Sequence, residues 1–375
     1  MADEQRQPAA EVVFERVTKR YPGRSEPAVN ELSLTVPAGE ICMLVGPSGG
    51  GKTTALKLVN RLIDFDEGDI RIGDQSVRSL DPVELRRRIG YVIQQVGLFP
   101  HLTIAGNIGT VPRLLGWPKE RIAERVSELL ELVGLEAEYS GRYPAQLSGG
   151  QRQRVGLARA MAADPLVMLM DEPFGALDPI TRDRLQNEFL RLHRQVRKTV
   201  LFVTHDIDEA IKMGDRIAIL REGGVLAQYD TPDAILANPV DEFVARFVGA
   251  DRGLKRLALR RVSDLELIAG PAAHPGDDAA PALAALDSFG FDTLVLLDDA
   301  GRPCGLLSRS ALNGGRISAA GARPVDSVVE ESASLRDALS TMLSQAGSHM
   351  TVVDGDGRYR GLVSADLISQ ELART

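Results

Sequence analysis

The eight residues 46–53 constrain the fold of this chain more than any other stretch, because they join an apolar run to a helix-like segment through glycines. They are Gly46, Pro47, Ser48, Gly49, Gly50, Gly51, Lys52 and Thr53, and they follow the apolar residues 41–45. A strand, a glycine loop and a helix in this order direct bare backbone N–H groups and the positive helix end at one point. This pattern predicts a phosphate-binding loop, and the alternative is a glycine turn with a solvated lysine.

The last residues of this loop have side chains that can bind phosphate and a metal ion. Lys52 supplies a point charge that can reach the β- and γ-phosphates of a nucleotide, and the Thr53 hydroxyl is placed to ligate Mg²⁺. Thr54 continues into the predicted helix, which runs through residues 54–59. The sequence therefore predicts a site for a phosphate chain with magnesium.

Two more apolar runs deliver polar residues at their carboxyl ends. Residues 166–170 are followed by Asp171 and Glu172, and residues 199–203 are followed, after Thr204, by His205. Continuous apolar runs are typical of buried parallel strands, and ligands bind at the carboxyl ends of such strands. We expect Asp171 to hold Mg²⁺ through its water shell and Glu172 to act as general base on water. His205 falls on the same edge, although a lone histidine there is more often structural.

Two further features are ambiguous by themselves. Ser148 caps a helix predicted over residues 155–163, and the glycines at 149 and 150 leave N–H groups bare for an anion; a capped helix with a basic face is the alternative. Tyr21, before the turn at Pro22, is an aromatic that can lie against a base, but a lone aromatic more often packs in a core.

Composition narrows the classes of partner. With 44 Lys and Arg against 52 Asp and Glu, the net charge is −8, which argues against a general nucleic-acid coat. The polar start has no signal-peptide pattern, and no stretch approaches the roughly 20 apolar residues that span a bilayer. The two cysteines, Cys42 and Cys304, suggest neither a disulfide framework nor a metal cluster, so a reducing cytosol is the natural compartment. Any membrane role is expected to come through a partner.

Residues 12–249 resemble the ATP-binding subunit of an ATP-binding cassette (ABC) transporter, because the motifs occur in that family's order. They are the aromatic Tyr21, the Walker A loop 46–53, the Q-loop glutamine Gln94, the signature residues 147–151, the Walker B residues Asp171 and Glu172, and the switch histidine His205; Asp178 also matches the D-loop aspartate. The fold class implied is α/β, a P-loop NTPase domain with an antiparallel β-subdomain and a helical subdomain at about 100–160, followed by a smaller α+β domain. One departure from the family is Gly50, where many relatives carry Ser or Cys; it removes no amide donor.

The resemblance also implies ATP and Mg²⁺ as cofactors, and a head-to-tail homodimer. ATP would then lie between Lys52 of one subunit and the signature residues Ser148, Gly149, Gly150 and Gln151 of the other. Thr53, Gln94 and Asp171 would ligate the metal, and Gln94 would report its state to the membrane partner. His205 would contact the γ-phosphate and position Glu172 and water.

The amino-acid composition of the chain changes after residue 249. The expected divisions are a tail at 1–11, the ATPase at 12–249, a basic linker at 250–261 and a repeat-containing domain at 262–375. Residues 296–308 align with 352–364 at an offset of 56, and each copy reads helix, strand, turn, strand, helix. This tandem resembles a CBS-domain pair. Such pairs often bind a nucleotide or respond to ions, but Asp366 lies one residue early for a ribose contact and the first copy has Ser310, so a purely dimerising role is the alternative.

The basic linker allows two interpretations. Its cations, among them Arg252, Lys255 and Arg256, can meet anionic headgroups and sense ionic strength, or they can form a solvated helix face.

An ABC ATPase followed by a CBS pair resembles the osmoprotectant uptake family, whose solutes include glycine betaine, carnitine, choline and proline. This implies membrane permease subunits, an extracytoplasmic substrate-binding protein that acts indirectly, and a peripheral location at the cytoplasmic face of the membrane. Three alternatives are open: an importer ATPase for a different solute, a soluble ABC ATPase without a transport role, and a nucleotide-binding regulator without turnover. The solute is inferred only by kinship, because the chain shows no substrate site of its own.

Overall fold

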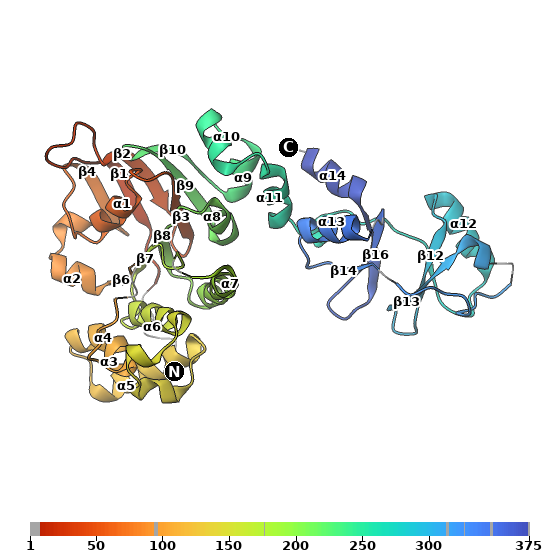
Figure 1. Ribbon diagram of the computed structural model, residues 1–375, viewed down its shortest axis with the longest axis horizontal. Helices are drawn as coiled ribbons and strands as arrows, with labels where there is room; N and C mark the ends of the chain where they lie inside the picture. The colour runs from red at the N-terminus through yellow and green to blue at the C-terminus, as the bar shows by residue number, and fades with distance from the viewer. Residues whose placement is uncertain are drawn as a thin grey trace. The chain divides into compact units, whose positions relative to one another are not determined.

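The computed structural model describes residues 8–93, 97–175, 177–312, 315–325, 327–345 and 348–373. The chain divides into two compact units, Met1–Val248 and Gly249–Thr375 (Figure 1). The predicted metal ligand Gln94 lies outside the described residues, so its role stays a prediction.

A six-stranded sheet forms the centre of the first unit, in the order β10-β9-β3-β8-β7-β6. The strands are β3 (Ile41–Val45), β6 (Ile89–Val92), β7 (Val167–Asp171), β8 (Thr199–Val203), β9 (Arg216–Arg221) and β10 (Val225–Asp230). All neighbouring pairs except β9 and β10 are parallel. The three apolar runs of the sequence, β3, β7 and β8, are adjacent and fully buried, so their carboxyl ends meet at one edge.

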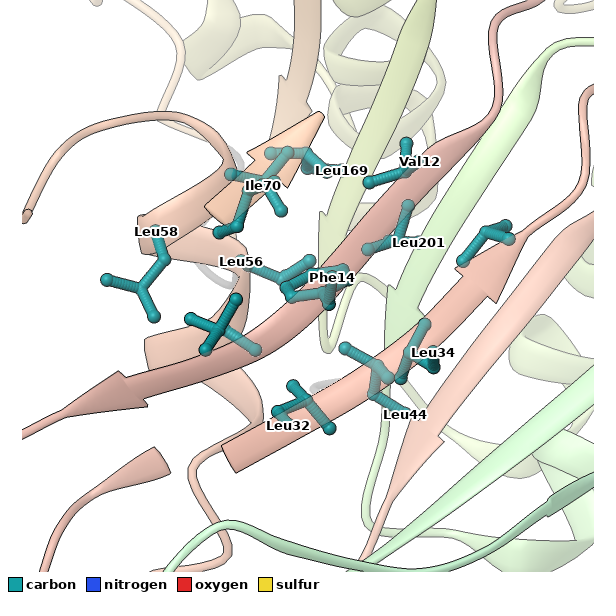
Figure 2. Packing of buried hydrophobic residues seen from close by; sticks show 14 of the residues in the cluster. Val12, Phe14, Leu32, Leu34, Leu44, Leu56, Leu58, Ile70, Leu169 and Leu201 are labelled. Carbon is teal, nitrogen blue, oxygen red and sulfur yellow. The ribbon is translucent and has the colours of Figure 1, made fainter. Parts of the chain in front are cut away.

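A second, antiparallel sheet has the order β2-β1-β4-β5. Its strands are β1 (Val12–Lys19), β2 (Val29–Val36), β4 (Glu67–Ile72) and β5 (Gln75–Ser76). Apolar side chains from this sheet, from the central sheet and from helix α1 (Lys52–Val59) share one core, which includes Phe14, Leu34, Leu56, Leu169 and Leu201 (Figure 2). The predicted antiparallel β-subdomain is therefore confirmed.

The helices of the first unit include a helical subdomain inserted between β6 and β7. The α-helices are α1 (Lys52–Val59), α2 (Pro82–Arg87), α3 (Ile104–Ile108), α4 (Thr110–Leu114), α5 (Lys119–Leu132), α6 (Gly149–Met161), α7 (Pro179–Val196), α8 (Ile207–Met213), α9 (Pro232–Ala237) and α10 (Glu242–Val248), and the 3₁₀ turns are η1 (Val77–Ser79), η2 (Ala137–Gly141) and η3 (Pro144–Gln146). The helix predicted to start at Val155 starts earlier, at Gly149, because Ser148 and Gln151 form a capping box.

The second unit contains the same motif twice. The first copy has β11 (Ala272–Ala273), α12 (Ala279–Phe289), β12 (Thr293–Leu297) and β13 (Pro303–Ser308), and the second has β14 (Val328–Glu330), α13 (Leu335–Ser344), β15 (His349–Val353) and β16 (Tyr359–Ser364). Thr293 pairs with Ser308 in one copy as His349 pairs with Ser364 in the other, so the register repeats at the predicted offset. The remaining elements are α11 (Arg252–Leu259), η4 (Val262–Asp264), η5 (Arg309–Ala311) and α14 (Ala365–Ala373).

The two copies exchange edge segments. Ile268, which precedes the first copy, forms an antiparallel bridge with Leu362 on β16, and Arg323, which precedes the second, bridges to Leu306 on β13. Each bridge has both backbone hydrogen bonds, at 2.8–2.9 Å. The unit is therefore one intertwined domain, although its copies have separate apolar cores.

The basic segment after residue 250 folds as helix α11 of the second unit. Its Leu257 is buried in the core around α13 and β15. Lys255 pairs with Asp251 at 3.2 Å, and Arg260 lies 3.6 Å from Glu371. These cations have acidic neighbours within their own chain, which favours the helix-face interpretation over a headgroup-binding one.

Candidate functional site

The glycine loop between β3 and α1 has the backbone conformation that the phosphate-binding pattern requires. Gly46 and Gly51 have φ of 146° and 76°, in the region that favours glycine. A Cβ atom at either position would lie 2.2 Å from a carbonyl oxygen, that of Leu220 or of Ala28. Gly51 caps α1 without a side-chain hydrogen bond, so no side chain covers the N–H groups of the first turn. These groups are suitable donors for an anion.

Lys52 and Thr53 are held at the mouth of this loop. The Lys52 Nζ donates hydrogen bonds to the carbonyl oxygens of Gly46 and Pro47, both at 2.8 Å. Burial lowers the pKa of Lys52, while the carboxylates of Glu172 and Asp171 act in the opposite direction. The Lys52 ammonium group therefore lies between the glycine loop and the carboxylates at the end of β7. The negative charge of a phosphate bound there would balance its positive charge.

Thr53 and Asp171 bring two oxygen ligands together from α1 and β7. The Thr53 hydroxyl donates to the Asp171 carboxylate at 2.9 Å. Burial raises the pKa of Asp171, and the hydrogen bond from Thr53 opposes this shift. A hydroxyl beside a carboxylate is the oxygen donor set that Mg²⁺ prefers, so these residues fit the predicted metal.

A cleft of about 610 Å³ opens over the loop. It is lined by Tyr21, Arg24, Ala28, Ser48, Gly49, Gly50, Gly51, Lys52, Thr53, Thr54 and Glu172. Tyr21 lines this cleft together with the glycine loop, and its contact with a base stays a prediction. Arg24 is a lining residue that the sequence analysis missed. A basic residue directly after the Pro22-Gly23 turn was the only available signal.

Glu172 and His205 extend from the ends of adjacent strands and meet. The Glu172 Oε1 lies 3.2 Å from the His205 Nδ1, with 22% and 67% of the two side chains exposed. Glu172 has φ of 44°, an uncommon value for a residue with a side chain, and its N–H donates to the Val203 carbonyl at 3.0 Å. Such backbone strain is often found at functional sites, where the surrounding structure enforces it.

The signature residues do not line this cleft. Ser148 Oγ accepts a hydrogen bond from the Gln151 N–H at 3.3 Å, and the Gln151 Oε1 accepts one from the Ser148 N–H at 2.9 Å. Ser148, Gly150 and Gln151 line a separate cavity of about 230 Å³. Ser148 and Gly149 are exposed. Within one subunit, Lys52 and the signature residues therefore line separate cavities. The predicted role of the signature residues requires a second subunit.

Asp178 begins helix α7 and ends the turn that follows Glu172. Its carboxylate accepts from the Thr181 N–H at 3.0 Å, and backbone hydrogen bonds, first that of Thr181, lower its pKa. In this structure Asp178 is a helix cap, and its predicted D-loop role concerns a second subunit.

A second cavity, of about 530 Å³, lies between α5, α6 and α7. Apolar side chains such as Leu132, Leu157 and Phe189 dominate its lining. It lacks a glycine loop with bare N–H groups for a phosphate chain, so the cleft over Lys52 is the candidate functional site. No helix in the part of the chain that the structure describes is both long and apolar enough to cross a membrane.

Two family models match the chain. One, described as ABC transporter, matches residues 29–175, and the other, described as CBS domain, matches residues 323–374. The second match covers the later copy in the second unit, and the earlier copy shares its topology.

Similar proteins extend over nearly the whole chain. The osmoprotectant import ATP-binding protein OsmV of Salmonella typhimurium is 45% identical over 96% of this chain and 96% of its own. The glycine betaine/carnitine/choline transport ATP-binding protein OpuCA of Bacillus subtilis is 44% identical over 94% and 93%. A dimeric structure of the ATP-binding cassette MJ0796, bound to ADP and Pi, is 35% identical with a TM-score of 0.52, covering 59% of this chain and 98% of that one.

Proposed function

This chain belongs to the ATP-binding subunits of ABC transporters, and from that premise we propose that it powers the import of osmoprotectants through separate membrane permease subunits. The solutes would be quaternary amines such as glycine betaine, carnitine or choline, or proline. The observation that carries the solute class is the 44–45% identity, over more than nine-tenths of the chain, to ATP-binding proteins of osmoprotectant import and of glycine betaine, carnitine and choline transport.

ATP would bind with its phosphates over the glycine loop and its base near Tyr21. The bare N–H groups of the first turn of α1 would donate to the phosphate oxygens, and Lys52 would turn from the Gly46 and Pro47 carbonyls toward the β- and γ-phosphates. Arg24 lines the same cleft and would add positive charge there. Thr53 and Asp171 would hold Mg²⁺, which supplies positive charge against the phosphates.

Hydrolysis would depend on Glu172 as the base that takes a proton from water. The His205 ring, 3.2 Å from the Glu172 carboxylate, would fix the direction of that carboxylate and contact the γ-phosphate. The Glu172 side chain reaches His205, which follows β8. The geometry thus favours a water held between Glu172 and the terminal phosphate.

We infer that two copies associate head to tail, because the exposed Ser148 and Gly149 lie outside the cleft that holds Lys52. The N–H groups at the start of α6 would then complete the γ-phosphate site of the partner subunit. ATP would join the subunits, and hydrolysis would release them.

Ser148→Arg is expected to prevent ATP-dependent dimerisation while leaving ATP binding to single subunits intact. The long side chain would occupy the position of the phosphate and abolish the cap of α6, which costs about 1 kcal/mol. Size-exclusion chromatography with light scattering, in the presence of ATP and Mg²⁺, measures the dimer. Glu124→Arg is the control, because it places an arginine at an exposed position of α5 that lines neither the cleft over Lys52 nor the cavity at Ser148, and it should dimerise as the parent does. A dimer of normal affinity in Ser148→Arg would contradict the head-to-tail arrangement.

The permease would dock where the Gln94 segment leaves the central sheet. Ile93 and Phe99 flank this segment and are 38% and 43% exposed. Exposed large apolar side chains are available to a protein partner. We propose that this region contacts the permease, which would place the chain at the cytoplasmic face of the cell membrane as a peripheral protein. An extracytoplasmic binding protein would meet the permease rather than this chain.

The second unit would act as a CBS pair that either dimerises or takes a nucleotide or an ion. We propose that the ATPase comprises residues 12–249 and the CBS pair residues 262–375, with α11 packed on the pair.

The proposed function is tested by solute uptake. Cells that lack this chain should lose the uptake of radiolabelled glycine betaine, carnitine, choline or proline, and the parent chain should restore it. Competition with each unlabelled compound identifies the solute. Unchanged uptake of all four, with loss of uptake of another solute, would overturn the proposed solute class while leaving the ATPase assignment standing.

A further inference from the structure

A buried carboxylate, Glu209, lies under the turn that carries His205. It belongs to helix α8, and only 7% of the residue is exposed. Burial raises its pKa. None of the steps described above uses this residue, and a buried carboxylate is costly unless its partners compensate it.

Glu209 contacts the turn that carries His205. The Glu209 N–H donates to the Asp206 Oδ1 at 3.2 Å, and the Asp206 N–H donates to the Thr204 Oγ1 at 3.1 Å. The Thr204 hydroxyl is also a polar partner of the Glu209 carboxylate and opposes the rise in its pKa. The hydroxyl therefore closes a tight turn around His205, and Glu209 holds that hydroxyl in place. Glu172, Thr204, His205 and Glu209 line the same small cavity.

The same carboxylate is fastened to helix α7. The Gln186 Nε2 donates to the Glu209 Oε1 at 2.9 Å, and the Gln186 Oε1 accepts from the Lys212 Nζ at 3.0 Å. On the same helix, the Arg182 Nη1 lies 3.7 Å from the Asp206 Oδ2. Because α7 begins directly after Asp178, these contacts join the His205 turn to the helix that carries the predicted D-loop residue.

We propose that Glu209 is a positioning residue for ATP hydrolysis, which holds the turn bearing His205 against Glu172 and fixes it to α7. The inference rests on the proposed function. Glu209 does not line the cleft over the glycine loop. It acts through Thr204 and His205, so its removal changes the orientation of the His205 ring rather than the binding of ATP.

Three single variants of the full-length protein test this role. Glu209→Ala should lower kcat by about tenfold with a KM for ATP near that of the parent, because a charge-compensating hydrogen-bond network is lost behind the site. Thr204→Val keeps the shape of the side chain and removes the hydroxyl, so it should lower kcat similarly. Glu209→Gln should retain most activity, since an amide can accept from Gln186 and donate to Thr204. Asp208→Ala, at an exposed neighbour on the same helix, is the matched control and should behave as the parent.

The decisive measurement repeats Glu209→Ala in a His205→Ala background. A residue that acts through His205 should cause no further loss there, whereas a merely structural role would lower kcat by the same factor in both backgrounds. Equal losses in the two backgrounds, or no loss in the parent, overturn the inference. If Glu209→Ala does not fold, Thr204→Val supports the same comparison.

Failure of the proposed function gives a different result. If the parent chain shows no ATP turnover that depends on Glu172, both proposals are overturned. Turnover that depends on Glu172 and is insensitive to both Glu209→Ala and Thr204→Val would overturn only the positioning role.

Discussion

Glu172→Gln lowers the rate of ATP hydrolysis by about 10³-fold, the effect expected when a general base is lost. Glutamine keeps the shape of the side chain and its contact with the His205 ring, but its amide does not accept a proton from water. ATP binding is expected to remain, because Lys52 and the glycine loop are unchanged. The variant should therefore accumulate as an ATP-bound dimer, which phosphate-release kinetics and light scattering with ATP and Mg²⁺ measure together.

A suitable control for this variant is Glu242→Gln on α10. The Glu242 side chain is 82% exposed and pairs with Arg246 at 3.6 Å, a contact that contributes little. Its turnover should match that of the parent. If Glu172→Gln hydrolyses ATP as fast as the parent, Glu172 is not the base. If it stays a single subunit with saturating ATP, both in solution and on its permease, the head-to-tail arrangement is wrong.

Lys52→Ala is expected to weaken ATP binding by about 30- to 100-fold, the effect of losing charge-assisted contacts to phosphate. The variant also loses the two hydrogen bonds at 2.8 Å that join the Nζ to the Gly46 and Pro47 carbonyls. Titration with a fluorescent ATP analogue measures the dissociation constant directly. Turnover at subsaturating ATP should fall at least as much.

The matched control for Lys52→Ala is Lys57→Ala on the same helix. Lys57 lies in the last turn of α1, outside the lining of the cleft, so its removal should leave the dissociation constant near that of the parent. Circular dichroism should show an unchanged fold for both variants. An ATP affinity for Lys52→Ala equal to that of Lys57→Ala would contradict the assignment of Lys52 to the phosphates.

The parts of the site that follow a strand were predictable from sequence. The apolar runs that become β3, β7 and β8 are each followed by their polar residues, and parallel strands bring those residues to one edge. The contact between Glu172 and His205 is a consequence of this local order. The α/β fold class was predictable for the same reason.

The missed residues depend on long-range packing. Arg24 enters the cleft because the antiparallel sheet packs on the central one, and no local pattern encodes that placement. Glu209 lies beside Asp206 and Asp208, so in the sequence it resembles an ordinary acidic first turn of a helix. Its burial arises only when α7 packs against α8.

Helix boundaries in the helical subdomain were less predictable than helix content. The resemblance implied a helical subdomain at about 100–160 without its internal boundaries, and within it Gly116, with φ of 73°, and Pro118 separate α4 from α5. The start of α6 was missed because Gly149 and Gly150 have low helix propensity, which the capping box outweighs.

The crossed bridges of the second unit determine how this chain can be shortened. A stop near residue 320 would strip Leu306 of its Arg323 bridge and Ile268 of its Leu362 bridge, and the surviving half would carry bare strand edges that invite aggregation. A stop after residue 250 instead removes both bridges together with both copies. We therefore expect the chain cut near residue 320 to be degraded faster than the chain cut at residue 250.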